Sequence, residues 1–463
     1  MSKKILVNVY NNDGIVEFAK NLSEKNDYDI FATEKNYEYL SANGLCVEKF
    51  DWQNTDFDVV VCNFYPLEKY LNKDMDEEEV LAHFDCEGLS IVQKFAKKYK
   101  DTIVLINPSQ YETVFEAIKN GTVTENLKKE LAEKALMQVC KLNATLLNIL
   151  DTNGVHLNLN EEKSGDLAYG ENQHQKAALY TGDTISYEVI ANRQLSTNNI
   201  LDINLATQMV SEFYDVNAAV VTRHAMPCAV ALGSTLEIAY QKAIDCDPIS
   251  AFGGVVAFSQ KVDTKLAKAL SSLLLDIVIA PDFDDDAIET LKECNLKLIK
   301  IFTPLKDFKA YLKNQITITP FGTLVQEPNT AELNTNSFKV VTKKKPTTEQ
   351  VEDMVFGWKV SKYTRSNSAI VVKDLKTVGI SQGQANRVEA VDIALDKACE
   401  NSKDAVLVTD GAIRTKDIIL DAAQARIAAI LQPAGTKKDK EIFDVADKYE
   451  LTMVRTLLRE FKH

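Results

Sequence analysis

The chain has little of what would mark a membrane, secreted or zinc-binding protein. Among its 463 residues are only five histidines and eight cysteines, and no two cysteines form a Cys-x-x-Cys pair. Single scattered cysteines argue against a structural zinc site and are typical of a reducing compartment. No apolar run approaches the ~20 residues of a membrane span, and the first residues enter a strand-like run without a signal-peptide core. We therefore expect a cytoplasmic protein without a membrane partner.

The chain also has fewer positively than negatively charged residues. The chain has 53 lysines and arginines against 67 acidic residues, which leaves a net charge of -14. Proteins that follow a nucleic-acid backbone need a basic face, so this balance predicts no nucleic-acid partner. An anionic ligand would have to meet a local cluster of cations. The apolar share of 45% and the charged share of 26% are those of an ordinary globular protein, and the length predicts about two to four domains.

The N-terminal third alternates between strand and helix patterns. Short apolar runs favour strands, and apolar residues spaced three or four apart after Ile15 favour a helix. We expect an α/β domain over residues 1–155, with a polar linker at 151–166. Its strands are expected at residues 5–9, 59–62 and 103–106, and its long helix at 131–150.

The same alternation returns in the rest of the chain, residues 156–463, which we expect to form the second domain. Alternating strands and helices imply right-handed crossovers and a mainly parallel sheet. In its last third we expect helices at residues 351–364 and before Cys399, and strands at 369–372, 377–380, 406–408 and 428–431.

His224 stands in the run Val-Thr-Arg-His-Ala-Met-Pro-Cys, just after the apolar residues 218–221. Such a run is typical of a buried parallel strand, and the ends of parallel strands collect ligand-binding groups. Asp247-Pro-Ile-Ser-Ala-Phe-Gly253 follows about one helix later. Polar residues follow several other apolar strands as closely, so we expect these groups to converge on one sheet edge: Arg223-His224, Ser381-Gln382-Gly383-Gln384, Thr409-Asp410 and Gln432-Pro433.

Each of these residues also has a plainer interpretation. A lone histidine is more often a satisfied core or surface residue than a catalyst. Gly383 could serve only a tight turn, and Asp410 could only cap the next helix. The pair Lys437-Lys438 is typical of a solvated face.

A series of short motifs runs in a fixed order from Tyr169 to His463. The motifs are Tyr-Gly-Glu-Asn-Gln-His-Gln (169–175), Arg-His-Ala-Met-Pro-Cys (223–228), Asp-Pro-Ile-Ser-Ala-Phe-Gly-Gly (247–254), Val-Ile-Ala-Pro (278–281), Thr-Leu-Val-Gln (323–326), Arg-Ser-Asn-Ser (365–368), Gly-Gln-Ala-Asn-Arg-Val (383–388) and the tail 459–463. In this order the sequence resembles the transformylase part of the bifunctional purine enzyme AICAR transformylase/IMP cyclohydrolase. The order is specific because it extends over roughly two thirds of the chain.

The resemblance implies a fold and an activity. The fold is α/β: an N-terminal methylglyoxal-synthase-like parallel-sheet domain, then a transformylase region of two cytidine-deaminase-like α/β subdomains. The activity is formyl transfer from 10-formyltetrahydrofolate to the ribonucleotide AICAR in de novo purine (IMP) biosynthesis. The expected ligands are an AICAR-like nucleotide and the folate, the expected assembly is a homodimer, and no metal takes part.

The resemblance also implies roles for single residues. Formyl transfer needs a base that titrates near neutral pH, which an imidazole supplies, and a neutral donor for the developing oxyanion. By position, His224 is the base, Asn367 the donor, and Asp410 helps to place the folate. Arg223 replaces a family lysine and supplies fixed positive charge. The remaining expected substrate-binding residues are Tyr169, Asn198, Gln384 and, on the nucleotide phosphate, Arg459.

Several positions depart from the family pattern. Ala168 replaces a phosphate-binding arginine, Met226 replaces an asparagine, and Ser381-Gln382-Gly383 replaces a Gly-x-Gly turn. Gly411-Ala412-Ile413-Arg414 stands where the family has a phenylalanine-rich folate wall. In the N-terminal domain, Ala32-Thr-Glu-Lys-Asn36 replaces a Ser-Thr-Gly-Gly-Thr phosphate loop, and the family's Lys-Thr-Leu-His-Pro segment is absent. We therefore expect no IMP cyclohydrolase activity.

Two hypotheses of different classes remain open at this stage. The chain is either a divergent AICAR transformylase with His224 as base, or a catalytically weak relative that binds nucleotide or a partner subunit. A zinc deaminase is excluded because Pro227-Cys228 lacks the second cysteine of Pro-Cys-x-x-Cys and no His-x-Glu occurs. His224, Asn367 and Asp410 favour the enzyme.

Overall fold

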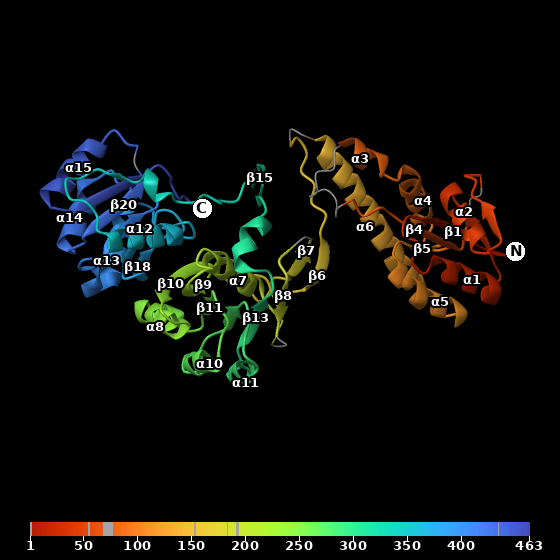
Figure 1. Cartoon of the computed structure of the whole chain (residues 1–463), viewed down its shortest axis with the longest axis horizontal. Coiled ribbons are helices and arrows are strands. Elements are labelled where there is room, and N and C mark those ends of the chain that lie inside the picture. Colours follow the sequence, from red (N-terminus) through yellow and green to blue (C-terminus); the bar gives the residue numbers. More distant parts are fainter. Residues whose placement is uncertain are drawn as a thin grey trace. The chain divides into compact units, whose positions relative to one another are not determined.

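Two units of unequal size make up the chain, Met1–Glu162 and Lys163–His463 (Figure 1). The computed structural model describes residues 2–53, 56–67, 77–151, 154–182, 184–190, 194–433 and 435–463. Within these ranges, no helix combines the length and the apolar character that a bilayer span requires.

The segment expected as a linker is only partly a loop. Its residues 152 and 153 lie outside the described ranges. Its end forms strand β6 (Glu162–Asp166), which pairs with β7 (Ala178–Thr181) in a two-stranded sheet. Every residue of β6 is exposed, so the sequence carried no apolar pattern by which a strand could be recognised.

Unit 1 contains a five-stranded sheet in the order β3-β2-β1-β4-β5, and all its neighbouring strands are parallel. The parallel N-terminal sheet expected from the sequence is confirmed. β1 is central, and its residues from Ile5 to Val9 are all buried, which suits a strand covered on both faces. The strands are β1 (Lys3–Val9), β2 (Tyr28–Ala32), β3 (Val47–Lys49), β4 (Val59–Asn63) and β5 (Ile103–Leu105).

Helices cover both faces of this sheet. Ile5 and Val7 of β1 pack under α1 (Ile15–Asn26), α2 (Glu34–Ala42) and α5 (Tyr111–Lys119). Leu6 points to the other face, under α4 (Cys86–Ala96) and α6 (Glu125–Leu150); α3 is a short helix at Glu77–Ala82. α6 begins earlier than the sequence predicted because Thr124 caps it, accepting a hydrogen bond from the Leu127 amide.

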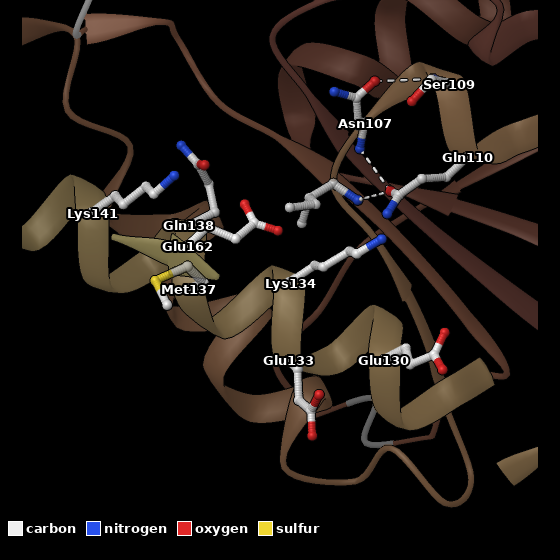
Figure 2. Close-up of a pocket in the computed structure, with 11 residues that line it drawn as sticks. Asn107, Ser109, Gln110, Glu130, Glu133, Lys134, Met137, Gln138, Lys141 and Glu162 are labelled. Carbon is white, nitrogen blue, oxygen red and sulfur yellow. Dashed lines mark hydrogen bonds between the residues drawn. The ribbon is translucent and has the colours of Figure 1, made fainter. Parts of the chain in front are cut away.

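A recess lies where β5 ends and α6 passes. A cavity of about 560 Å³ is lined there by Asn107, Gln110, Lys134 and Gln138, among others (Figure 2). The Gln110 side chain fixes the chain as it leaves β5, because its Oε1 accepts hydrogen bonds from the Ile106 and Asn107 amides at 2.8 and 2.9 Å.

Unit 2 is built on one twelve-stranded sheet in the order β16-β21-β20-β19-β17-β18-β10-β9-β11-β12-β13-β8. The strands are β8 (Tyr187–Val189), β9 (Asn217–Arg223), β10 (Met226–Gly233), β11 (Val255–Phe258), β12 (Ile277–Ala280), β13 (Lys297–Ile301), β16 (Lys339–Val340), β17 (Ala369–Lys373), β18 (Lys376–Ser381), β19 (Val406–Thr409), β20 (Ala429–Pro433) and β21 (Thr452–Thr456).

The prediction of a mainly parallel sheet is wrong for unit 2. Among the described strand pairs of this sheet, β11·β12, β12·β13, β19·β20 and β20·β21 are parallel and the others are antiparallel. β9, expected as a parallel strand, is antiparallel to both its neighbours. Two of the antiparallel pairs, β9·β10 and β17·β18, are tight hairpins closed at His224-Ala225 and Asp374-Leu375, whose φ angles all lie near +54°. Neither turn has the Asn-Gly or Asp-Gly sequence that usually marks such a hairpin.

The two halves of unit 2 repeat one order of elements: a helix, a hairpin, and then helices that alternate with parallel strands. The first half has α7 (Thr197–Ser211), α8 (Leu236–Cys246), α10 (Thr264–Leu270) and α11 (Asp285–Glu293), and the second has α12 (Thr348–Ser361), α13 (Arg387–Ala398), α14 (Lys416–Gln424) and α15 (Asp439–Lys448). The halves join where β10 pairs antiparallel with β18.

The first helix of each half holds the hairpin turn that follows it. Asp202 of α7 accepts a hydrogen bond from the Ala225 amide at 2.7 Å. Asp353 of α12 accepts one from the Leu375 amide at 2.8 Å. Both carboxylates are buried, and hydrogen bonds of this charge-assisted kind are the strong ones. The equivalent bonds explain why non-glycine residues adopt positive φ in both turns.

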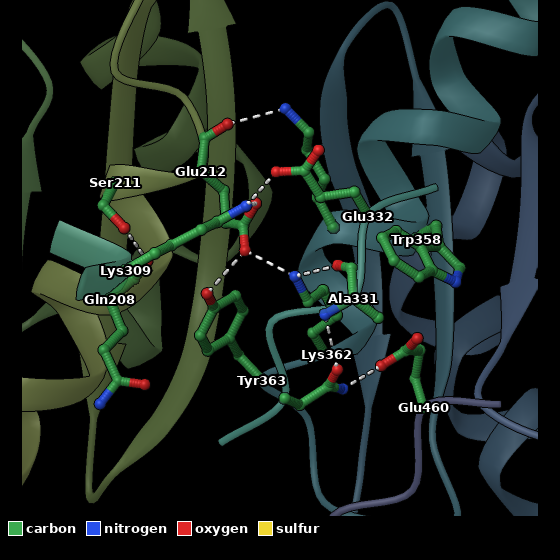
Figure 3. Close-up of polar contacts among 12 residues, drawn as sticks. Gln208, Ser211, Glu212, Lys309, Ala331, Glu332, Trp358, Lys362, Tyr363 and Glu460 are labelled. Atoms are coloured by element: carbon green, nitrogen blue, oxygen red, sulfur yellow. Dashed lines mark hydrogen bonds and ion pairs between the residues drawn. The ribbon is translucent and has the colours of Figure 1, made fainter. Parts of the chain in front are cut away.

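A buried polar network ties the end of α7 to the end of α12 (Figure 3). The Glu212 carboxylate accepts from Lys362 Nζ at 2.7 Å and from the Tyr363 hydroxyl at 3.0 Å. Burial, with the negative charge of Glu212 beside it, raises the pKa of Tyr363 well above its usual range. Lys309 lies 3.7 Å from the same carboxylate and also pairs with Glu332 at 2.9 Å. The two halves of unit 2 are thus joined by ionic contacts as well as by the sheet.

Breaking this network should destabilise unit 2 far more than breaking a surface pair. Lys362→Met leaves the buried Glu212 carboxylate without its closest cation, which we expect to cost about 3 kcal/mol of unfolding free energy. Lys416→Met is the control: Lys416 pairs with Glu441 at 2.6 Å, but both side chains are 52% exposed, so its loss should cost under about 1 kcal/mol. Urea unfolding in a Trp52→Phe background, where Trp358 fluorescence reports unit 2, measures both. Equal losses would contradict the ranking.

Candidate active site

Strand directions in unit 2 bring four polar segments to one edge of the sheet. The register pairs Arg223 with Met226, and it pairs Ala369 with both Ser381 and Thr409. The ends of β9, β18, β19 and β20 therefore lie at the same edge, which we call the site edge. This edge carries Arg223-His224, Ser381 to Gln384, Thr409-Asp410 and Gln432-Pro433.

His224 projects from the turn at this edge. Its side chain is exposed and its backbone has a φ of 54°. The carboxylate of Asp202 lies directly beneath, bonded to the next amide in the turn. Burial raises the pKa of Asp202, and the hydrogen bond from Ala225 opposes that rise. A solvent-accessible imidazole on a firmly held turn can accept a proton from a ligand bound at this edge.

Arg223 joins the turn to the second segment singled out in the sequence. Its Nη1 donates to the Phe252 carbonyl oxygen at 2.7 Å. That segment contains a short helix, α9 (Pro248–Ala251), capped by Asp247, which accepts from the Ser250 amide at 2.9 Å. Gly253 follows with a φ of 71°. Arg223, the residue before His224, therefore fixes the loop that contains Phe252 and Gly253.

Tyr169 and Asn198 lie together at the start of α7. The Tyr169 carbonyl oxygen accepts from the Thr197 amide at 3.1 Å, and Asn198 Nδ2 donates to the Glu171 carbonyl oxygen at 3.1 Å. The loop that carries Tyr169 is thereby fastened to the helix whose Asp202 holds the histidine turn.

Asn367 and Gln384 are also brought together. Their backbones exchange hydrogen bonds of 3.1 and 3.2 Å, and Asn367 Nδ2 donates to the Gln384 carbonyl oxygen at 3.0 Å. A longer contact, 3.4 Å, joins the same amide to Ala385. The peptide bond between Ser366 and Asn367 is cis, and Gly383 has a φ of 70°. Gly383 therefore does serve a tight turn.

Asp410 does not cap a helix, so that interpretation is wrong. The next helix, α14, begins at Lys416 after Thr415. Asp410 is 1% exposed, and its Oδ1 accepts from Arg387 Nη2 at 3.0 Å. Its Oδ2 has no hydrogen-bond partner among the described residues. One carboxylate oxygen is thus fixed by an arginine while the other is unsatisfied.

The C-terminal tail, residues 459–463, runs beside Asp410 and Ser366. The Glu460 amide donates to the Asp410 carbonyl oxygen at 3.1 Å, and the Ser366 amide donates to that of Lys462 at 2.9 Å. The guanidinium of Arg459 lies 4.3 Å from the centre of the Phe461 ring. These contacts place the Arg459 segment beside Asp410.

The structure does not bring His224 into direct contact with Asp410. Three strand spacings separate β10, beside the histidine turn, from β19, which ends at Asp410. At the usual spacing between strands this is about 14 Å. A ligand would have to extend along the site edge to meet both residues.

Two residues of this edge were missed by sequence reasoning. Arg387 stands inside the motif Gly-Gln-Ala-Asn-Arg-Val, but nothing in the spacing showed that it pairs with Asp410. Its Nη1 also donates to the Ala412 carbonyl oxygen at 3.1 Å. Asp202 lies on a helix face, and only the turn geometry explains its burial. A buried acid on an otherwise apolar helix face was the one signal available for it.

Comparisons with known proteins decide the family. The family model described as "AICARFT/IMPCHase bienzyme" matches residues 95–397. A bifunctional purine biosynthesis protein PurH of Thermoanaerobacter sp. (strain X514) is 35% identical over 516 aligned positions, covering all of both chains. PurH of Clostridium botulinum (strain Kyoto / Type A2) is 36% identical over 512 positions, again covering all of both. The chain belongs to the AICARFT/IMPCHase bienzyme family.

Membership confirms the family assignment made from the motifs. The alignments with the two PurH relatives extend over more positions than the 463 residues of this chain, so parts of those relatives have no counterpart here. Among solved structures, "Crystal structure of ForH" is similar over 32% of this chain and 98% of its own, with 17% identity and a TM-score of 0.28.

Arg387 should hold both Asp410 and the tail in this member of the family. Arg387→Met leaves a buried carboxylate without its ion-pair partner, which we expect to cost about 3 kcal/mol of stability. It should also speed hydrogen exchange at the Glu460 amide, because that amide donates to the backbone of Asp410. Arg414→Met, an exposed arginine of the same loop, is the control and should change neither quantity. Unchanged exchange at Glu460 in Arg387→Met would show that the tail is held by other contacts.

Proposed function

We propose that unit 2 transfers a formyl group from 10-formyltetrahydrofolate to AICAR in purine biosynthesis. The proposal joins family membership to one observation: a single sheet edge holds His224, Asn367, Asp410 and the segment of Arg459. We also propose the finer architecture: a methylglyoxal-synthase-like, IMP-cyclohydrolase-like domain over residues 1–155, and an AICAR-transformylase-like domain of two cytidine-deaminase-like subdomains over 156–463. The two equivalent halves of unit 2 support the second part.

The proposed chemistry follows from the groups at the edge. The AICAR amine attacks the formyl carbon, a new carbon–nitrogen bond forms, and the bond from that carbon to the folate nitrogen breaks. His224 takes the proton from the amine and returns it to the departing tetrahydrofolate nitrogen. Arg223 supplies fixed positive charge. Asn367 Nδ2 donates to the Gln384 carbonyl oxygen at 3.0 Å and lies 3.4 Å from that of Ala385. We assign its more weakly bonded N–H to the oxyanion.

The proposed ligand contacts extend from both ends of the edge. Tyr169 and Asn198 are assigned to the nucleotide, and Asp410 and Gln384 to the folate. Arg459, whose segment lies beside Asp410, is assigned to the nucleotide phosphate, so the nucleotide would extend along the edge toward Asp410. A folate joined to a nucleotide is long enough to span the roughly 14 Å between β10 and β19. The eight unpaired cysteines support the cytoplasm as the location of this reaction.

In unit 1 we propose that IMP cyclohydrolase activity is absent. The segment at the family's phosphate loop uses its polar groups internally: Asn36 bonds the Val9 amide and carbonyl at 2.8 and 2.9 Å, and the Thr33 hydroxyl donates to Asn8 at 2.8 Å. Groups already bonded within the protein are poorly placed to hold a phosphate.

One incubation tests both activities. Purified protein with AICAR and 10-formyltetrahydrofolate should release tetrahydrofolate, and the product should remain formylated AICAR without closing to IMP faster than it does unaided. His224→Ala should reduce tetrahydrofolate release by about 100-fold or more, the usual contribution of a general base. His156→Ala changes another exposed histidine, outside the proposed site, and should leave the rate unchanged.

The outcomes separate the alternatives. No tetrahydrofolate release by the unaltered protein would favour the non-catalytic relative that binds nucleotide or a partner. Full activity in His224→Ala would remove the mechanism and leave the fold. Enzyme-dependent IMP formation would contradict the proposal for unit 1 alone.

We also propose a homodimer. The supporting observation is a hairpin of unit 2 that joins no larger sheet among the described strands. Strands β14 (Gln315–Thr319) and β15 (Gly322–Gln326) pair only with each other among the described strands. The side chains of Ile318 and Phe321 are 80% and 101% exposed. An isolated two-stranded hairpin is marginally stable in water, and exposed apolar groups of this size mark interfaces.

The assembly is measured directly by sedimentation equilibrium. The unaltered protein should have the mass of two chains, and Phe321→Glu should shift it toward one chain by placing a charge in the interface. Tyr449→Glu, at an exposed aromatic residue on the end of α15, is the control. A single-chain mass for the unaltered protein would refute the dimer.

A further inference from the structure

The buried network around Glu212 continues into the C-terminal tail. Glu460 of the tail is 3% exposed, and its Oε2 accepts a hydrogen bond from Asn329 Nδ2 at 2.5 Å. Two residues further along that loop, the Ala331 carbonyl oxygen accepts from Lys362 Nζ at 2.9 Å (Figure 3). The same lysine binds Glu212. The tail is therefore fixed to the junction between the two halves of unit 2.

The Glu460 side chain serves as an anchor for the tail backbone. Burial raises the pKa of its carboxyl group, while the hydrogen bond from Asn329 and the positive charge of Lys362 oppose that rise. The Glu460 amide donates to the Asp410 carbonyl oxygen at 3.1 Å. Separating a buried carboxylate from its donor and its nearby cation is costly. The backbone is thus held at Glu460 from two sides, by its own amide and by its side chain.

The two residues that flank Glu460 turn their side chains the other way. Successive side chains of an extended chain lie on opposite sides of it, and here Arg459 and Phe461 are exposed while Glu460 is buried. The Arg459 guanidinium lies 4.3 Å from the centre of the Phe461 ring, which is close enough for a cation–π contact. The ring therefore holds the guanidinium on the exposed side of the tail.

Phe461 is in turn placed by Gly411. A Cβ atom at position 411 would lie 2.6 Å from Phe461 Cε1 and 2.2 Å from Arg387 Nη2, so any larger residue there would push both side chains away. The Arg387 guanidinium is a second cation near the ring, 5.9 Å from its centre. The ring thus rests on the loop that follows β19, beside Asp410.

The positive charge of Arg459 is available to a ligand. Among the described residues, no carboxylate lies within ion-pair distance of its guanidinium. An arginine presents a planar fork of donors that matches a phosphate. Its long side chain has many rotamers, however, and ordering such a side chain during binding weakens the affinity. A guanidinium that is already held on an aromatic ring avoids part of this loss.

We propose that Glu460 and Phe461 are positioning residues, which hold Arg459 where its guanidinium meets the nucleotide phosphate. Glu460 fixes the backbone, and Phe461 fixes the guanidinium. Together they make the site prefer a nucleotide to its nucleoside. The proposal rests on the contact between Arg459 and the phosphate in the proposed function, but it concerns binding, so it can be tested whether or not formyl transfer follows.

Calorimetric titration of the full-length protein with AICAR, and competition by the corresponding nucleoside, test the proposal. Phe461→Ala should weaken AICAR binding about fivefold, the effect of one cation–π contact, and should leave nucleoside binding unchanged because the nucleoside has no phosphate. Phe461→Tyr keeps a ring and should bind AICAR as the unaltered protein does. Leu457→Ala, at a residue 78% exposed just before the tail, is the control and should change neither affinity.

Two further comparisons separate positioning from a general loss of structure. Glu460→Ala should weaken AICAR binding as selectively as Phe461→Ala does, whereas Glu460→Gln can keep the hydrogen bond to Asn329 and should restore most of the affinity. In an Arg459→Ala background, neither Phe461→Ala nor Glu460→Ala should weaken AICAR binding further, because the group that they position is gone.

Several results would overturn the proposal. Unchanged AICAR binding in Phe461→Ala, or equal weakening of nucleotide and nucleoside, would show that the ring does not act through the phosphate. A further loss from Phe461→Ala in the Arg459→Ala background would show that it does not act through Arg459. Absence of AICAR binding by the unaltered protein would remove this proposal together with the phosphate contact. The expected binding pattern without tetrahydrofolate release would support the positioning and contradict only the formyl transfer.

Discussion

The antiparallel contact between β10 and β18 determines which residues of the two halves of unit 2 lie at the same edge of the large sheet. It turns the second half of unit 2 over relative to the first, so the hairpin turn of one half lies beside the strand ends of the other. A parallel contact would have put His224 and Asp410 at opposite edges. The contact itself is narrow, since a single register pair joins Ala231 to Lys376. The Glu212 network and the shared packing of α7 and α12 supply the rest of the junction.

The sequence predicted the location of elements better than their direction. Apolar runs marked β1, β4 and β17 to within a residue or two, because strands buried on both faces are apolar throughout. Direction depends on the connections, and two hairpins were closed by His224-Ala225 and Asp374-Leu375 without any glycine. Their conformation comes from carboxylates on helices distant in sequence, and no local pattern encodes such a contact.

At the candidate site, too, the sequence predicted which residues take part better than it predicted their contacts. Motifs identified His224 and Asn367, and a polar residue after an apolar strand identified Asp410. The register explains how strand ends bring them to one edge. The sequence did not show that Arg387 fixes Asp410, because ion pairs between separate loops have no characteristic spacing. It also did not show that the Asn367 amide is partly used by the backbone of Gln384. Identity of a residue is readable from a motif, whereas its available hydrogen-bonding groups depend on the folded surroundings.

The bond between Asp202 and the histidine turn has a consequence for the entropy of reaction. A base on a loose loop loses its orientational freedom each time a substrate binds, and that loss raises the barrier. Here the turn is immobilised when unit 2 folds, by a buried carboxylate 2.7 Å from the Ala225 amide. The backbone of His224 is thereby preorganised. For the base that we propose, the entropy of orienting this backbone would be lost once, during folding, and not in each catalytic cycle.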